Sequence, residues 1–122
     1  MIQPAKPIVL IVEDETLIRM LAVDAFLEEG FDVLEAEHAA EALQVHADAA
    51  EIHVLFTDVN MPGALNGIDL AERLKAAAPT RHLIITSALP ILRPVDHLPA
   101  TFVSKPYDAG VVSRTARAFL AA

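Results

Sequence analysis

Residues 8–14 read Ile-Val-Leu-Ile-Val-Glu-Asp, an unbroken apolar run that ends in two acids, Glu13 and Asp14. Such a run is typical of a β-strand that is covered on both faces. Two later apolar runs end in Asp58 and in Lys105-Pro106. Parallel strands of an open α/β sheet end at one edge, so we expect these acids and the lysine to converge there. Three carboxylates and an ammonium in one pocket indicate a divalent cation and a phosphoryl group.

The composition limits the classes of protein to which the chain can belong. Its 122 residues suffice for one domain with a single core, and 54% hydrophobic against 21% charged residues indicates a globular chain. No apolar run is long enough to span a bilayer or to form a signal sequence, so we expect a cytoplasmic protein without membrane insertion. The lack of cysteine excludes disulfides and thiolate zinc sites. A net charge of −8 argues against direct binding of nucleic acid.

Apolar segments of strand length alternate along the chain with segments of helical spacing. After the strand at residues 8–12, further strands are predicted at residues 32–36, 52–57, 83–86 and 101–104. Helices are predicted from Leu17 to a C-terminal glycine at Gly30, and at residues 39–47, 68–78 and 109–122. The pattern predicts an α/β fold, a doubly wound five-stranded parallel sheet with helices on both faces, as one domain over residues 1–122.

One segment interrupts this alternation. Residues 88–100, between the fourth and fifth predicted strands, contain Pro90, Pro94 and Pro99. A proline inside a helix removes a backbone donor and clashes with the preceding turn, which costs about 3 kcal/mol or more. We therefore expect the fourth helix to be short, distorted or absent.

Taken together, these features resemble the receiver domain of two-component response regulators over essentially the whole chain. The match is carried by Glu13-Asp14, by Thr57-Asp58-Val59-Asn60-Met61-Pro62-Gly63, by Gly67, by Thr86-Ser87 followed by Ala88, and by Phe102-Val103-Ser104-Lys105-Pro106. Any one of these pieces is a weak signal, but their common order and their placement at predicted strand ends make a strong one. The resemblance implies a flavodoxin-like receiver fold with strand order 2-1-3-4-5.

The resemblance also implies a role for each charged residue of the pocket. Asp58 would accept a phosphoryl group from the phosphohistidine of a sensor histidine kinase or a histidine phosphotransfer protein. Mg²⁺ would be bound by Asp58, by Asp14, by the backbone carbonyl of Asn60 and, through water, by Glu13. Lys105 would pair with Asp58 and then with the phosphoryl oxygens, next to a cis bond to Pro106. Such a domain is no enzyme, although it catalyses its own phosphotransfer and autodephosphorylation.

A switch that senses the new phosphoryl oxygens is a further implication of the resemblance. Thr86 and Ser87 both offer a hydroxyl, and alternation along a strand lets only one of them point into the pocket. We choose Ser87, because the family places a small residue after this hydroxyl and Ala88 fits; Thr86 is the alternative. Phe102 matches the aromatic residue that changes rotamer. Because the flanking helix is the proline-rich segment, we hypothesise that the output surface departs from the usual one.

Two other functional classes stay open on the sequence. A receiver fold can serve as an interaction module without phosphorylation, although none of the acceptor, the acids and the lysine is lost here. A phosphohydrolase of the haloacid-dehalogenase type also has a nucleophilic aspartate after an apolar strand. That family expects a second aspartate two residues later, where this chain has Asn60, and its cap domain has no room in 122 residues.

If the sequence is a complete gene product, we expect a stand-alone receiver, since it ends soon after its last helix. Output would then pass through contacts with a downstream protein, or the domain would serve as an intermediate or sink in a phosphorelay. Phosphorylation could also drive formation of a homodimer.

Overall fold

The computed structural model describes residues 6–49, 51–77, 82–91 and 93–121. Five parallel strands form one sheet in the order β2-β1-β3-β4-β5, which confirms the predicted topology. They are β1 (Ile8–Val12), β2 (Asp32–Ala36), β3 (Val54–Asp58), β4 (His82–Ser87) and β5 (Ala100–Ser104). The strand order reverses between β1 and β3, and ligands of open α/β sheets bind beside the carboxyl ends of strands at such a point.

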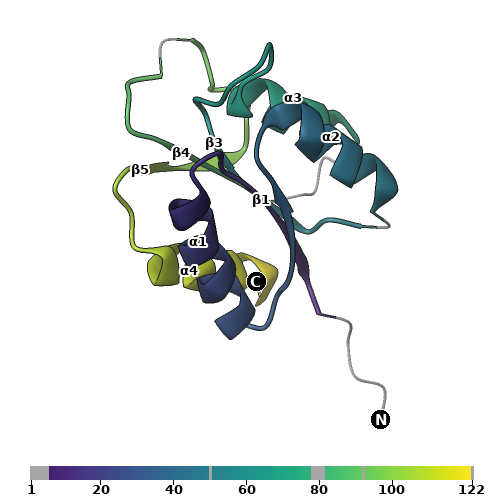
Figure 1. Cartoon of the computed structure of the whole chain (residues 1–122), viewed down its shortest axis with the longest axis vertical. Coiled ribbons are helices and arrows are strands. Elements are labelled where there is room, and N and C mark those ends of the chain that lie inside the picture. Colours follow the sequence, from purple (N-terminus) through teal and green to yellow (C-terminus); the bar gives the residue numbers. More distant parts are fainter. Residues whose placement is uncertain (1–5, 50, 78–81, 92, 122) are drawn as a thin grey trace.

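In the described part of the chain, four helices cover the sheet: α1 (Thr16–Glu28), α2 (Ala39–Asp48), α3 (Gly67–Ala77) and α4 (Ala109–Ala121). Figure 1 shows α1 and α4 on one face and α2 and α3 on the other. Strand residues alternate between the two faces. Leu10 and Leu55 pack on the α2–α3 side, whereas Val9 and Phe56 pack on the α1–α4 side. The doubly wound arrangement is therefore confirmed. None of the described helices has the length and hydropathy needed to cross a membrane.

Most predicted boundaries agree with the observed ones within two residues. β3 begins at Val54 and not at residue 52. Just before it, the His53 ring accepts a hydrogen bond from the Ile8 backbone N–H at 3.0 Å. Gly30 follows α1 with a φ of 85°, in the left-handed region expected of a glycine at a helix end. The predicted ends of two helices, Ala78 and Ala122, lie outside the described residues.

Residues 88–99, which we call the β4–β5 connection, contain no helix in their described parts, 88–91 and 93–99. This confirms the expectation drawn from the three prolines. The connection is nevertheless anchored by apolar contacts, because Leu98 is buried and Ile91 and Val95 pack on the α2–α3 side of the core.

An ion-pair network also fastens the β4–β5 connection to α3. Arg93 contacts Asp69 at 2.8 Å and Glu72 at 2.6 Å. His97 contacts the other carboxylate oxygen of Glu72, and Lys75 donates a hydrogen bond to the His97 backbone carbonyl at 2.9 Å. The connection is thus tied to a neighbouring helix by side chains, in place of the backbone hydrogen bonds of a helix of its own.

Replacing Arg93 with alanine is expected to lower the free energy of unfolding by about 1 kcal/mol at neutral pH, because both of its ion pairs are partly exposed. Hydrogen bonds from the Asn66 backbone and from Arg93 lower the pKa of Asp69. A carboxylate with a lowered pKa stabilises the fold above its ordinary pKa of about 4 and loses this effect as the pH falls through the lowered value. The difference between wild type and variant should therefore shrink at acid pH.

Urea denaturation at neutral pH and at about pH 3 measures this difference. Arg117→Ala, on exposed α4 surface, is the matched control and should change stability little at either pH. A loss from Arg93→Ala that is equal at the two pH values would contradict an ionic origin.

Candidate functional site

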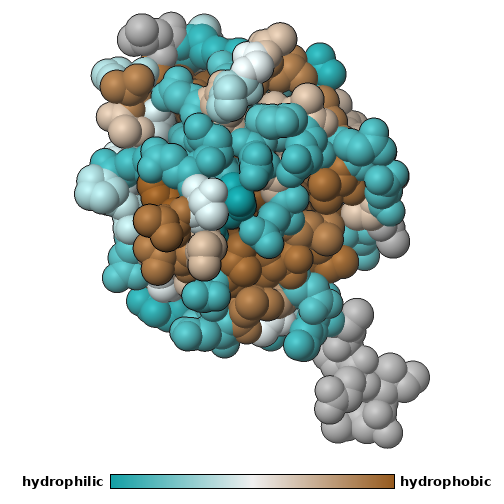
Figure 2. Space-filling model, viewed as in Figure 1, coloured by the Kyte–Doolittle hydropathy of each residue, from teal (hydrophilic) through white to brown (hydrophobic). Residues whose placement is uncertain are grey.

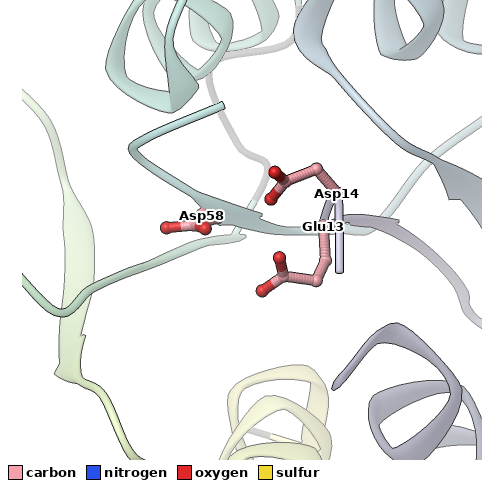
Figure 3. A group of neighbouring side chains, drawn as sticks. All are labelled: Glu13, Asp14 and Asp58. Carbon is pink, nitrogen blue, oxygen red and sulfur yellow. The ribbon is translucent and has the colours of Figure 1, made fainter. Parts of the chain in front are cut away.

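The carboxylates of Glu13, Asp14 and Asp58 meet at the carboxyl ends of β1 and β3, around a shared space (Figure 3). Because β1 and β3 pair with Val12 opposite Thr57, the residues that follow lie side by side. One carboxylate oxygen from each acid lies within 4.8 Å of the other two. Glu13 and Asp58 are buried, whereas Asp14 is exposed. The sequence predicted that these three acids converge at the strand ends, and the structure brings them together there.

These three acids form a donor set that suits a small, hard cation. Carboxylate oxygens are ligands that Mg²⁺ prefers, and Mg²⁺ usually keeps several of its waters. The exposed side chain of Asp14 leaves one side of the group open to such waters. Burial raises the pKa of Glu13, and a hydrogen bond from Lys105 opposes this change. The group therefore carries a concentration of negative charge that a divalent cation would relieve.

Lys105 joins the acids from the end of β5. Its Nζ donates hydrogen bonds to Glu13 Oε1 at 2.8 Å and to Asp58 Oδ2 at 2.9 Å. Burial of the ammonium works against its charge, but the hydrogen bonds to Glu13 and Asp58 outweigh burial and raise the pKa of Lys105. The Lys105-Pro106 peptide bond is cis, as the resemblance implied. Lys105 is thus a permanent positive charge in direct contact with both buried acids.

Gly67 sets how closely α3 approaches Asp58. Its backbone N–H donates to the Val59 carbonyl at 2.9 Å, and it is the first residue of α3. A Cβ atom at Gly67 would lie 1.9 Å from the Asp58 carbonyl oxygen, so no other residue fits without displacing that backbone. The sequence offered Gly67 as one of the matched positions, but its steric reason depends on the tertiary structure.

The two candidate switch hydroxyls differ in their surroundings. Ser87 Oγ donates to the Leu89 carbonyl at 2.7 Å and accepts from the Leu89 N–H at 3.1 Å and from the Asn60 side chain at 3.4 Å. It therefore links the loop after Asp58 to the start of the β4–β5 connection. Thr86 is buried and stands opposite Asp58 in the β3–β4 register. The switch role of Ser87 and the ligand role of the Asn60 carbonyl stay predictions.

Phe102 lies in β5 opposite Ile85 of β4 and is 41% exposed. A large aromatic residue this exposed has room to change its rotamer. The β4–β5 connection packs toward α3, and so this part of β5 remains open to solvent. The switch role of Phe102 is still a prediction.

Tyr107 and Thr86 also lie at the site, and no sequence pattern indicated a role for Tyr107. Both line a small space together with Glu13 and Asp58. Burial and the negative charge of Glu13 raise the pKa of Tyr107 to about 12, so its phenol stays protonated. The Tyr107 ring packs edge-to-face on Phe56, with ring centroids 5.3 Å apart. Its position two residues after Lys105 was the only available sequence signal.

A comparison with known families identifies this arrangement. The family model described as the response regulator receiver domain matches residues 9–113. The chain belongs to this family. Its sheet topology is thus that of a receiver domain of two-component signal transduction, and its acidic group fits such a domain. The alternative of a haloacid-dehalogenase-type phosphohydrolase is excluded.

Curated receiver proteins share part of this sequence. The chain is 38% identical over 80 residues to the aerobic respiration control protein ArcA of Escherichia coli K12, which covers 66% of this chain and 33% of ArcA. It is 40% identical over 68 residues to the chemotaxis protein CheY1 of Helicobacter pylori J99, which covers 55% of this chain and 54% of CheY1. The chain therefore spans between about a third and about half of the length of these relatives.

Solved receiver structures share the whole fold. The receiver domain of the hybrid histidine kinase CckA is 29% identical with a TM-score of 0.77, over 93% of this chain and 98% of that one. A receiver protein of Sinorhizobium medicae WSM419 has a TM-score of 0.85 at 18% identity, over 96% of both chains. The BeF₃-activated DrrB receiver domain has a TM-score of 0.79 at 20% identity, over 97% of this chain and 100% of that one. The matches to the Sinorhizobium medicae protein and to DrrB, with their low sequence identity, establish the fold alone.

Proposed function

We propose that Asp58 of this receiver domain accepts a phosphoryl group from the phosphohistidine of a sensor histidine kinase or a histidine phosphotransfer protein. The observation that carries the proposal is the contact of Lys105 with two buried acids, Glu13 and Asp58, beside the exposed Asp14. Members of the family are signalling modules that carry a phosphoryl group on an aspartate, and Asp58 is the acid in contact with Lys105 at the end of β3.

The transfer moves one phosphoryl group from nitrogen to oxygen. A carboxylate oxygen of Asp58 forms a bond to phosphorus, the bond between phosphorus and the donor's imidazole nitrogen breaks, and that nitrogen keeps the electron pair. The added phosphoryl group brings negative charge, and Lys105 then donates one of its hydrogen bonds to a phosphoryl oxygen in place of a carboxylate. Asp14, Glu13, Asp58 and the Asn60 carbonyl would hold Mg²⁺, which when bound offsets the repulsion between carboxylate and phosphoryl oxygens.

The conformational response is assigned to Ser87 and Phe102. The Ser87 hydroxyl is already bonded to Asn60 and to Leu89, so a pull toward the phosphoryl oxygens would move the start of the β4–β5 connection. The exposed Phe102 would then change its rotamer. Since the connection carries no helix in its described parts, the surface that a downstream protein or a second copy reads would differ from that of a helix.

Incubation with acetyl phosphate and Mg²⁺ tests this function directly. We expect intact mass to show one added phosphoryl group, and EDTA to prevent the addition. Failure of the wild-type domain to gain a phosphoryl group under these conditions would favour the alternative, an interaction module that is independent of phosphorylation. The cytoplasmic location expected from the sequence fits a histidine kinase or a histidine phosphotransfer protein as the partner.

The surface beside the acidic site supports a protein, and not a small molecule, as the phosphoryl donor. Leu17, Met20 and Leu21 on α1 are 76%, 54% and 66% exposed. Figure 2 shows apolar side chains gathered over the part of this face where Figure 1 places α1 and α4. An apolar pocket of about 580 Å³, lined by Leu21, Lys105 and residues at the start of α4, opens here. Large exposed apolar patches mark protein contact sites, and this one borders the acceptor.

Leu21→Asp is expected to slow transfer from a donor kinase by about tenfold, since a central apolar contact is worth more than 1 kcal/mol. Phosphorylation by acetyl phosphate should not change, because Leu21 forms no part of the acidic group. The measurement is the transfer rate from a purified, phosphorylated kinase that serves the wild-type domain.

Leu27→Asp is the matched control, because Leu27 is 53% exposed and lies near the C-terminal end of α1, beyond Leu21. It should leave both reactions unchanged. Equal rates of phosphoryl transfer from the kinase to Leu21→Asp and to wild type would show that α1 does not contact the donor.

A further inference from the structure

Thr86 carries a buried hydroxyl without a partner. The residue is 2% exposed, and its Oγ1 makes no hydrogen bond. Thr57, another buried threonine of the sheet, shows the usual arrangement, since the Thr57 hydroxyl donates to the Asp58 carbonyl at 2.9 Å. Buried hydroxyl groups without a hydrogen bond are uncommon in native proteins, and they destabilise the state in which they occur.

The surroundings of Thr86 restrict what its partner can be. Thr86 lines a small space with Glu13, Asp58 and Tyr107, and this space leaves no room for a water molecule. Water therefore does not satisfy the hydroxyl. Of the polar neighbours, Asp58 stands directly opposite Thr86 in the register of β3 and β4. Side chains paired in this way across two strands are close neighbours on the same face of a sheet.

In the unphosphorylated site, the buried acids receive their hydrogen bonds from another donor. Lys105 occupies Asp58 Oδ2 and Glu13 Oε1, so both buried acids already receive a hydrogen bond from an ammonium. Valine has the shape of threonine and would fill the same place without an unpaired polar atom. A hydroxyl here brings a benefit only in another state of the site, in which a carboxyl oxygen facing the interior lacks a donor.

We propose that Thr86 is a positioning residue, whose hydroxyl donates to the Asp58 carboxyl group when the site carries a phosphoryl group. This rests on the proposed function, in which Lys105 turns a proton from the carboxylates to a phosphoryl oxygen. The Asp58 carboxyl group then loses the hydrogen bond from Lys105. The Thr86 hydroxyl donates in its place, from the side away from solvent. Ser87 has a separate role, because it is the next residue of the strand and its hydroxyl is bonded to Asn60 and Leu89.

Thermal unfolding of wild type, Thr86→Val and Thr86→Ser tests this, each with EDTA and with Mg²⁺ and beryllofluoride, the phosphoryl analogue of the DrrB structure. In EDTA, Thr86→Val should match or exceed the wild-type Tm, by up to about 3 °C, because it removes an unpaired hydroxyl. Its apparent affinity for beryllofluoride should fall about tenfold, and Thr86→Ser should retain the wild-type affinity.

Thr115→Val is the matched control on α4, where the hydroxyl donates to the Val111 carbonyl at 2.8 Å. It should leave the affinity for beryllofluoride unchanged. Equal affinities of wild type and Thr86→Val, or a failure of Thr86→Ser to keep the wild-type affinity, would overturn the role of Thr86. A wild-type domain that beryllofluoride does not stabilise would instead overturn the proposed function itself.

Discussion

Replacing Asp58 with asparagine is expected to abolish the phosphoryl adduct that wild type forms with acetyl phosphate and Mg²⁺. An amide oxygen is a far weaker nucleophile than a carboxylate oxygen, and the substitution also removes one of the three charges that would hold the cation. Intact mass of both proteins, before and after the incubation, measures the effect.

The fold of this variant should persist, because Lys105 keeps its hydrogen bond to Glu13. Asp32→Asn is the matched control, since Asp32 is an exposed acid at the start of β2, away from the carboxyl ends of the strands. It should gain the phosphoryl group as wild type does. An adduct that survives Asp58→Asn at the wild-type level would place the acceptor elsewhere.

Gly67→Ala is expected to have the largest effect on stability, a loss of about 3 kcal/mol or more. The new Cβ would lie 1.9 Å from the Asp58 carbonyl oxygen and 3.0 Å from the Val59 Cα, both backbone atoms that no side-chain rotation can move aside. Either the start of α3 or the end of β3 must shift. Urea denaturation reports the stability, and the rate of labelling by acetyl phosphate reports the displacement of Asp58.

Gly110→Ala provides a control in a second helical glycine. A Cβ there would meet the Arg114 guanidinium at 3.0 Å and the Asp108 carboxylate at 3.2 Å, both on side chains that can adjust. Alanine is also the better helix former, so stability should stay within about 1 kcal/mol of wild type. Similar losses for the two variants would show that the close approach at Gly67 does not matter.

Local patterns were sufficient to predict the architecture and the acidic group. The runs before Glu13 and Asp58 are short, apolar and β-branched, and such strands almost always lie in a parallel sheet covered on both faces. Since parallel strands share one carboxyl edge, the meeting of these acids with Lys105 followed from the strand assignments. The α1 end at Gly30 was equally local, because it depends on one backbone conformation.

Other features depend on contacts between distant residues, and no local pattern contains them. The clash that reserves position 67 for glycine involves the backbone of Asp58, nine residues earlier. The prolines predicted the loss of a helix between β4 and β5, but Arg93 gave no sign that it would pair with α3, 24 residues before it. The unpaired hydroxyl of Thr86 could be recognised only once its neighbours were in place.

The bond between the Leu89 N–H and the Ser87 hydroxyl makes one backbone amide a reporter of the side chain assigned as the switch. Deuterium replaces an amide proton slowly while that proton is hydrogen-bonded and faster once its acceptor leaves. If Ser87 turns toward a phosphoryl group, the Leu89 amide loses this acceptor on an exposed segment. Pro90 has no amide proton to obscure the signal. The rate of hydrogen exchange at this one position would therefore follow the switch itself, without any knowledge of what the domain signals to.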